Sequence, residues 1–153
     1  MVILAGAEFD IILKIIFSSI LGMIIGLERE LDLQPAGLRT HALVCMGSAL
    51  FAALSIVFVG DGADPSRIAA GIVTGIGFLG AGTIFVSKNT IKGLTTAADL
   101  WVIAGIGLAV GVGLYVVALA TTIIVYMTLV FGRYIKKAEN KKFSLIRRFN
   151  NSD

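Results

Sequence analysis

Apolar residues dominate five stretches of the chain, and short polar or glycine-rich segments separate them. The five stretches cover about 9–27, 41–59, 67–86, 94–112 and 114–132. A helix that crosses a bilayer needs about 20 mostly apolar residues, and each stretch reaches that length. The pattern therefore predicts an all-α, polytopic membrane protein, with a five-helix transmembrane domain over 1–132 and a basic tail over 133–153.

The boundaries between the spans differ in clarity. The segment 60–66 is dense in glycine, aspartate and proline and predicts a turn. Between the last two spans, only Gly111 and Gly113 indicate a break. The alternative is one bent helix over 94–132, which is about twice as long as a single membrane span requires. We therefore expect the chain to turn at these two glycines.

Composition agrees with a membrane protein and excludes several classes of site. Hydrophobic residues make up 57% of the chain, charged residues 15%, and the mean hydropathy is +0.93. Soluble domains carry about 25% charged residues, so a soluble domain and a disordered chain are both excluded. The single cysteine, Cys45, excludes a disulfide framework and a cysteine-based zinc site, and is expected to be a small buried residue. The single histidine, His41, excludes a multi-histidine metal site.

The distribution of positive charge predicts the orientation in the membrane. If the tail is cytoplasmic, eleven of the 13 lysines and arginines lie on the cytoplasmic side, Arg67 lies outside, and Lys14 lies within the first span. Cytoplasmic loops carry an excess of lysine and arginine. We therefore expect the N-terminus outside and the C-terminus inside. The segment 1–10 has acidic residues and no lysine or arginine, so no cleavable signal peptide is expected.

The tail carries seven of these basic residues between Arg133 and Arg148, with Glu139 as the single acid among them. Such a segment beside a membrane span is typical of a contact with anionic lipid. Apolar residues at roughly helical spacing predict an interfacial helix on the inner leaflet: Ile135, Ala138, Leu145 and Phe149. The alternative is a solvated, frayed tail. Nucleic-acid binding is not expected, because the tail lacks a folded basic surface.

Glycines follow two patterns. Gly75, Gly77 and Gly80 match the GxGxxG spacing of dinucleotide sites, but that motif needs a preceding strand and a βαβ unit, so we reject this interpretation. In lipid, small residues let helix backbones approach closely. Glycines at helical spacing or clustered in one run predict packing faces: Gly22 and Gly26, Gly71 and Gly75, Gly77, Gly80 and Gly82, and Gly107 and Gly111.

These packing faces are compatible with a compact monomer or with a homo-oligomer, and the sequence does not separate the two. A broken helix that lines a cavity, as in transporters, is the alternative for the glycine-rich run 75–83.

Charged residues cluster where the first span ends. Glu28, Glu30 and Asp32 could hold a hydrated Mg²⁺, which often binds through only one or two carboxylates. The alternative is a solvated helix end with Arg29 and Arg39 as partners of these acids. Beyond this weak magnesium site, no cofactor is expected.

Ionisable residues within spans are functional candidates and should have partners. For Lys14 we expect Asp10, four residues earlier on the same helix. Asp99 lies near the inner end of the fourth span, and Lys14 lies near the outer end of the first span, so the two are too far apart in depth to pair. Arg39 starts at the inner face, and we therefore expect it to be the partner of Asp99. Thr95 or Thr96 should satisfy part of the carboxylate, and the alternative is a protonated Asp99 bonded within its own helix.

The turn into the second span holds further candidates. Arg39 is expected to be an inner-leaflet anchor or a partner of an anion or buried acid. Thr40 and His41 follow it directly, and His41 is expected to lie at the interface rather than to bind a ligand.

Four segments, in order, resemble the MgtC/SapB family of bacterial inner-membrane proteins. They are GLERE at 26–30, AGLRTH at 36–41, GIGFLGAGTIF at 75–85 and KGLTTAADLW at 92–101. The resemblance covers about 22–112. Longer members of the family carry a soluble C-terminal domain after the fifth span, and this chain, which ends at Asp153, is expected to be a short form without it.

The resemblance implies two functions. The first is a non-enzymatic inner-membrane protein that regulates a partner membrane protein in adaptation to low magnesium or related stress, in a family linked to virulence. Interaction with ATP synthase is proposed for some members. The second is a small ion or solute transporter with its site among Glu28, Arg39, Thr95, Thr96 and Asp99. An enzyme is not expected, because no serine lies in a nucleophile elbow.

Overall fold

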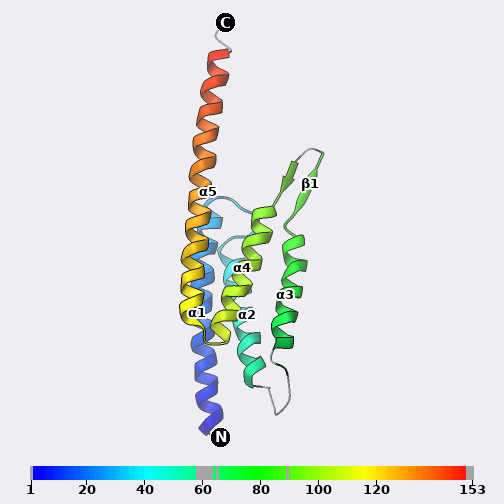
Figure 1. Ribbon diagram of the computed structural model, residues 1–153, viewed down its shortest axis with the longest axis vertical. Helices are drawn as coiled ribbons and strands as arrows, with labels where there is room; N and C mark the ends of the chain where they lie inside the picture. The colour runs from blue at the N-terminus through cyan, green and yellow to red at the C-terminus, as the bar shows by residue number, and fades with distance from the viewer. Residues whose placement is uncertain (1, 58–63, 65, 89, 151–153) are drawn as a thin grey trace.

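The computed structural model describes the backbone of residues 2–57, 64, 66–88 and 90–150, and the side chains of 6–57, 64, 66–88 and 90–135. Within these residues the chain forms five helices and one two-stranded hairpin (Figure 1). The elements are α1 (Val2–Leu31), α2 (Leu38–Val57), α3 (Ser66–Ala81), β1 (Phe85–Ser87), β2 (Thr90–Lys92), α4 (Leu94–Gly111) and α5 (Tyr115–Asn150). The predicted all-α, polytopic membrane fold is confirmed.

Four of the helices contain segments long and apolar enough to cross a membrane: Gly6–Leu31, Leu38–Val57, Leu94–Gly111 and Tyr115–Ile135. Helix α3 is apolar but has only 16 residues. At 1.5 Å per residue it is about 24 Å long, somewhat less than the hydrocarbon thickness of about 30 Å.

The third predicted span, 67–86, extends too far at its C-terminal end. Helix α3 ends at Ala81, and a turn follows in which the Thr83 hydroxyl donates a hydrogen bond to the Gly80 carbonyl at 2.8 Å. Phe85 and Val86 then belong to strand β1, which pairs in antiparallel register with β2. Hydropathy could not find this change, because an apolar run has the same hydropathy in a strand as in a helix.

The break between α4 and α5 is confirmed. Helix α4 ends at Gly111, and Gly113 has a φ of +86°, a left-handed conformation that glycine adopts without strain. The chain reverses over these residues and enters α5 at Tyr115. At the other end of the molecule, Leu33 has a φ of +54° just after α1, and α2 begins at Leu38.

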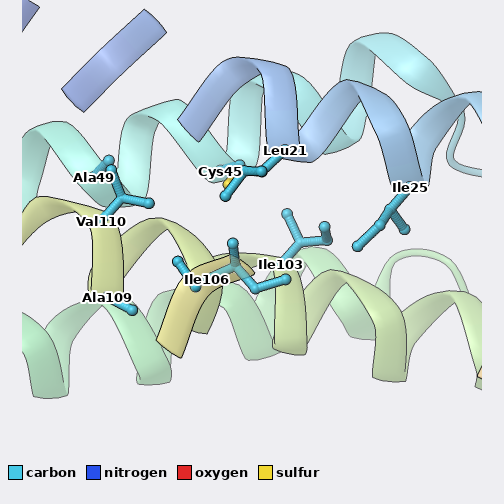
Figure 2. Close-up of a cluster of buried hydrophobic side chains, with 9 residues drawn as sticks. Leu21, Ile25, Cys45, Ala49, Ile103, Ile106, Ala109 and Val110 are labelled. Atoms are coloured by element: carbon cyan, nitrogen blue, oxygen red, sulfur yellow. The ribbon is translucent and has the colours of Figure 1, made fainter. Parts of the chain in front are cut away.

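The core lies where α1, α2 and α4 meet. Leu21 and Ile25 of α1 contact Cys45 of α2 and Ile103 and Ile106 of α4, and all five are buried (Figure 2). The expectation that Cys45 is a small buried residue is confirmed. The outer faces are also apolar, and Val116 on α5 is 81% exposed. Such surfaces are stable only against lipid or another apolar partner.

Close helix approach is found at some of the predicted glycines. A Cβ at Gly22 would lie 2.6 Å from the His41 carbonyl oxygen, and one at Gly26 would lie 2.7 Å from the Leu38 Cα. On α4, a Cβ at Gly107 or Gly111 would collide with the backbone of α2. These four glycines therefore set the spacing of α2 against α1 and α4.

The glycines of α3 behave differently. A Cβ at Gly71, Gly75 or Gly77 would meet no heavy atom within 4 Å among the described residues. These three glycines therefore make no close helix contact among the described residues, and packing between copies of the chain stays a prediction. Farther along the run, a Cβ at Gly80 would make an ordinary contact with Ala97, and one at Gly82 would lie near the Leu79 carbonyl of the preceding turn.

Two predictions fall partly outside the described residues. Of the predicted turn over 60–66, only positions 64 and 66 are described; there Asp64 Oδ1 accepts the Ser66 N–H at 2.9 Å. Hydrogen bonds from the Ser66 hydroxyl and N–H hold the pKa of Asp64 below its usual range. The tail backbone is helical to Asn150 and continues α5 beyond the other helices (Figure 1). The side chains of 136–150 are outside the described set, so the interfacial helix stays a prediction.

Candidate functional site

A buried ion pair joins α1 to α4. Arg29 Nε lies 2.7 Å from Asp99 Oδ2, and the two side chains are only 5% and 3% exposed. Arg29 Nη2 also donates to the Thr96 hydroxyl at 3.4 Å. Thr96 and Asp99 are three residues apart on α4, so they share one helix face. Arg29 therefore bridges two polar groups that would otherwise be buried alone among apolar helices.

His41 of α2 completes this cluster and is fully buried. Its Nδ1 lies 2.9 Å from the Gly37 carbonyl oxygen, and its Nε2 lies 3.4 Å from Asp99 Oδ1. A carbonyl oxygen can only accept a hydrogen bond, so Nδ1 is the donor there. This bond orients the ring so that Nε2 faces the Asp99 carboxylate.

A second charged group lies beside the first, between α1 and α5. Arg133 of α5 pairs with the buried Glu28 and, through Nε, with Asp32 Oδ1 at 3.1 Å. It also donates to the Glu28 carbonyl oxygen at 3.3 Å. Glu28 Oε2 is buried and has no hydrogen-bond partner among the described residues. One guanidinium therefore serves two carboxylates.

The predicted pair between Asp99 and Arg39 is wrong. Asp99 does pair with an arginine from the end of the bundle where α1 connects to α2, but that arginine is Arg29. Arg39 is exposed in the first turn of α2, whereas His41, two residues later and about 200° around the helix, faces the core. For the same reason, His41 is buried rather than interfacial.

The three carboxylates proposed as magnesium ligands do not converge. Glu28 and Asp32 share a face, as their spacing predicted, but they face Arg133. Glu30 points elsewhere, and its Oε2 accepts the Leu38 N–H at 2.8 Å. Among the described residues, no group of three histidine, cysteine or acidic side chains is arranged to hold a metal ion. The three carboxylates therefore do not meet at one point, and weak magnesium binding stays a prediction.

Of the remaining candidates, Thr95 is exposed at the start of α4. Thr40 and Arg39 border a shallow polar cavity of about 310 Å³ with Glu30, Gln34 and Gly37. The prediction for Lys14 is confirmed, since its Nζ lies 2.7 Å from Asp10 Oδ2. The structure therefore brings Arg29, Thr96 and Asp99 together with His41, buries Glu28 beside Arg133, and leaves Glu30, Arg39, Thr40 and Thr95 exposed.

Sequence reasoning missed Arg133 as a partner within the bundle, because it was counted with the tail. Two signals could have found it. Arg133 is the first basic residue after the fifth apolar stretch, and Glu28 and Asp32 form an i, i+4 acidic face at the same membrane depth. Arg29 likewise lies three residues after Gly26, on the stripe of α1 that packs against α2.

An apolar groove opens on the other side of the bundle. It has a volume of about 620 Å³, and it is lined by α2 and α3 and by Ala104 of α4. Three glycines line it, Gly47 of α2 and Gly71 and Gly75 of α3, among larger apolar side chains such as Phe51 and Leu79. Two of the three α3 glycines without neighbours, Gly71 and Gly75, therefore lie in this groove.

Comparison with known proteins identifies the family. The MgtC family model matches residues 15–138. YhiD of Escherichia coli, whose name proposes that it transports magnesium, is 44% identical over 147 residues, which cover 91% of this chain and 67% of YhiD. The protein MgtC of Salmonella typhimurium is 49% identical over 117 residues, which cover 76% of this chain and 50% of MgtC.

An uncharacterised protein of Haemophilus influenzae is 37% identical over 138 residues, covering 84% of this chain and 58% of that protein. The chain thus spans between half and two thirds of the length of these relatives. No solved structure matches it significantly. With the family model matching most of its length and with four long apolar helices, the chain is an integral membrane protein that belongs to the MgtC family.

Proposed function

We propose that the protein is a non-enzymatic regulator that binds a partner membrane protein and acts in adaptation to low magnesium or related stress. The relatives support the magnesium connection, since the name of YhiD refers to magnesium transport. We propose the bacterial inner membrane as its location, with the N-terminus outside and the C-terminus in the cytoplasm, from the distribution of lysine and arginine.

The state of the buried charges favours regulation over transport. A transported cation needs a site with unoccupied oxygen ligands. Here Asp99 is paired with Arg29, and Glu28 and Asp32 are paired with Arg133. Pairs of this kind hold helices together, and removing one partner leaves an uncompensated buried charge. These ion pairs are therefore better suited to stabilising the packing of α1 against α4 and α5 than to forming an ion pathway.

The groove between α2 and α3 supplies the surface for a partner, and this single observation carries the proposal. It is apolar, it lies along helices that face lipid, and Gly47, Gly71 and Gly75 let another backbone approach. We propose that a transmembrane helix of the partner protein occupies it. A lipid acyl chain and a second copy of this chain are the other occupants to test.

The test fills the groove without disturbing the fold. Gly75→Leu places a side chain in open space, so the purified variant should melt within a few degrees of the wild type in detergent. Gly132→Leu is the matched control, because Gly132 is an exposed glycine of α5 outside the groove with equally open surroundings. In cells that depend on the protein for growth at low magnesium, Gly75→Leu should abolish growth and Gly132→Leu should support it.

Growth supported equally by both variants would remove the groove as the site of action. If Gly75→Leu fails and the amount of protein in the membrane also falls, the variant is unstable, and the assumption of open space at Gly75 is wrong.

The alternative is a small ion transporter with its site at the inner ends of α1, α2 and α4. One observation favours it: Glu28 Oε2 is buried and has no partner among the described residues, so it could accept a proton or a cation. Magnesium or proton flux through the pure protein in liposomes would support this function.

A further inference from the structure

The β1–β2 hairpin leaves its apolar side chains largely exposed in the part of the chain that the structure describes. Phe85 is 61% exposed, Val86 76% and Ile91 59%. A two-stranded hairpin alone is marginally stable in water, and three or more strands or a packing surface are normally required. A hairpin with this much exposed apolar surface therefore needs a surface to lie on.

The strand register separates the hairpin into two faces. Val86 pairs with Ile91, and because paired residues share a face, these two form an apolar face. Phe85 pairs with Lys92, and Ser87 with Thr90, so the opposite face is mixed. Lys88 follows β1 at the turn, where its φ is +27°. The hairpin is thus amphipathic, with one lysine at its tip and one near its base.

The base of the hairpin is fixed to α4. Gly93 has a φ of +89°, and a Cβ there would collide with the Thr83 carbonyl, so the two ends of the hairpin are in close backbone contact. The Gly93 carbonyl accepts the Ala97 N–H at 2.9 Å and begins α4. Since α4 is a candidate membrane span, the hairpin is held at the membrane surface.

Its end of the molecule is also the basic one. The hairpin lies at the same end as the α1–α2 connection and the C-terminus (Figure 1). Lys88 and Lys92 are the charged residues of the hairpin, and the sequence contains no acidic residue between Asp64 and Asp99. The surface of the cytoplasmic leaflet is negative, and it attracts such juxtamembrane lysines.

We propose that the β1–β2 hairpin is a lipid-binding element. Val86 and Ile91 enter the boundary between headgroups and acyl chains, and Lys88 and Lys92 bind the phosphates of anionic phospholipids. This contact is separate from the basic tail and does not depend on the regulatory function proposed above. It fixes the depth and tilt of α3 and α4 relative to the membrane surface.

The test measures the depth of the hairpin in the full-length protein. An environment-sensitive fluorophore is attached to Val86→Cys in a Cys45→Ala background, and the protein is placed in nanodiscs of phosphatidylglycerol and phosphatidylcholine or of phosphatidylcholine alone. Nitroxide lipids labelled near the headgroup should quench the fluorophore in anionic discs, and aqueous iodide should not. Adding Lys88→Gln and Lys92→Gln should shift the equilibrium toward the water-exposed form by about fivefold per lysine.

Lys136→Gln with Lys137→Gln is the charge-matched control, and it should leave the quenching of the hairpin label unchanged. Both hairpin lysines are exposed, so the variant should keep the wild-type melting temperature. Iodide quenching in anionic discs would overturn the proposal, because the hairpin would then lie in water. Insertion that is equal in both kinds of disc would overturn the role of the lysines. A label that is shielded from both quenchers would mean that protein, not lipid, covers the hairpin.

Discussion

At the scale of single residues, the protein buries more charge than its apolar helices would tolerate without compensation. Arg29, His41 and Asp99 come from three helices and are each less than 5% exposed overall. A charge at this depth persists only if it is paired and hydrogen-bonded. The Arg29–Asp99 contact at 2.7 Å therefore holds α1 against α4. His41 brings α2 into contact with the same carboxylate.

The first prediction tests the contribution of the Arg29–Asp99 ion pair to stability. Arg29→Gln should lower the free energy of unfolding by about 3–5 kcal/mol, because it leaves the Asp99 carboxylate buried and unpaired. Adding Asp99→Asn should restore much of the loss, since the double variant buries no charge at this pair. Denaturant unfolding in detergent measures all three variants.

Arg39→Gln is the control for the first prediction. Arg39 is exposed, so its replacement should change stability by less than about 0.5 kcal/mol. If the losses in free energy of unfolding for Arg29→Gln and Asp99→Asn are strictly additive, the two side chains do not interact. A large loss for Arg39→Gln would mean that Arg39 also takes part in the buried charged group.

Sequence could predict that Asp99 needs an arginine from the inner end of the bundle, but not which arginine. Arg29 and Arg39 both lie near that depth. Which of them faces Asp99 depends on how each helix is rotated about its own axis. That rotation is set by packing at Gly22 and Gly26, where α2 approaches α1. For Lys14 the partner was predictable, because Asp10 lies on the same helix and needs no tertiary information.

At the scale of elements, glycine determines how close α4 lies to α2. The backbone of Gly107 lies directly against the Cys45 carbonyl, and Ser48 of α2 donates a hydrogen bond to the Ala104 carbonyl at 2.6 Å. A side chain at position 107 would therefore have to push a backbone group rather than a flexible side chain.

The second prediction compares two glycines of one helix. Gly107→Ala should destabilise the protein by about 1–3 kcal/mol through overpacking. Gly105→Ala should be neutral or slightly stabilising, because an added Cβ there meets open space and alanine favours the helix. Melting temperatures of the two variants in detergent provide the comparison, and equal values would show that α4 can move away from α2 at little cost.

The elements also show where hydropathy is sufficient and where it is not. The four long helices and the break at Gly113 were predictable, because length, apolar content and glycine conformation are local properties. The end of α3 and the hairpin were not. Ile84, Phe85 and Val86 continue an apolar run, and only the pairing of β1 with β2 distinguishes them from a further turn of helix.

At the scale of the whole molecule, charge is strongly asymmetric. The end of α1, the start of α2, the hairpin and the C-terminal part of α5 lie at one end (Figure 1). Together they carry eleven of the 13 lysines and arginines. This asymmetry predicts that the end with the hairpin faces the cytoplasm.

The third prediction follows from the asymmetry. In a Cys45→Ala background, Asp64→Cys should react with an impermeant maleimide added outside intact cells. Ser87→Cys in the hairpin should react only after the membrane is opened. Both positions are exposed, so differences in labelling report the side of the membrane rather than burial. Labelling of Ser87→Cys from outside would invert the proposed orientation.

We expect the buried charges to hold the helices together and not to conduct ions. The most direct test reconstitutes the purified wild-type protein into liposomes that contain a fluorescent magnesium indicator, beside protein-free liposomes and liposomes with an established magnesium channel. Magnesium should enter the liposomes with wild-type protein no faster than it enters protein-free liposomes, and should enter the liposomes with the channel rapidly. Saturable magnesium entry through the wild-type protein alone would show that this chain is a transporter and that its buried charges do not serve only to hold the helices together.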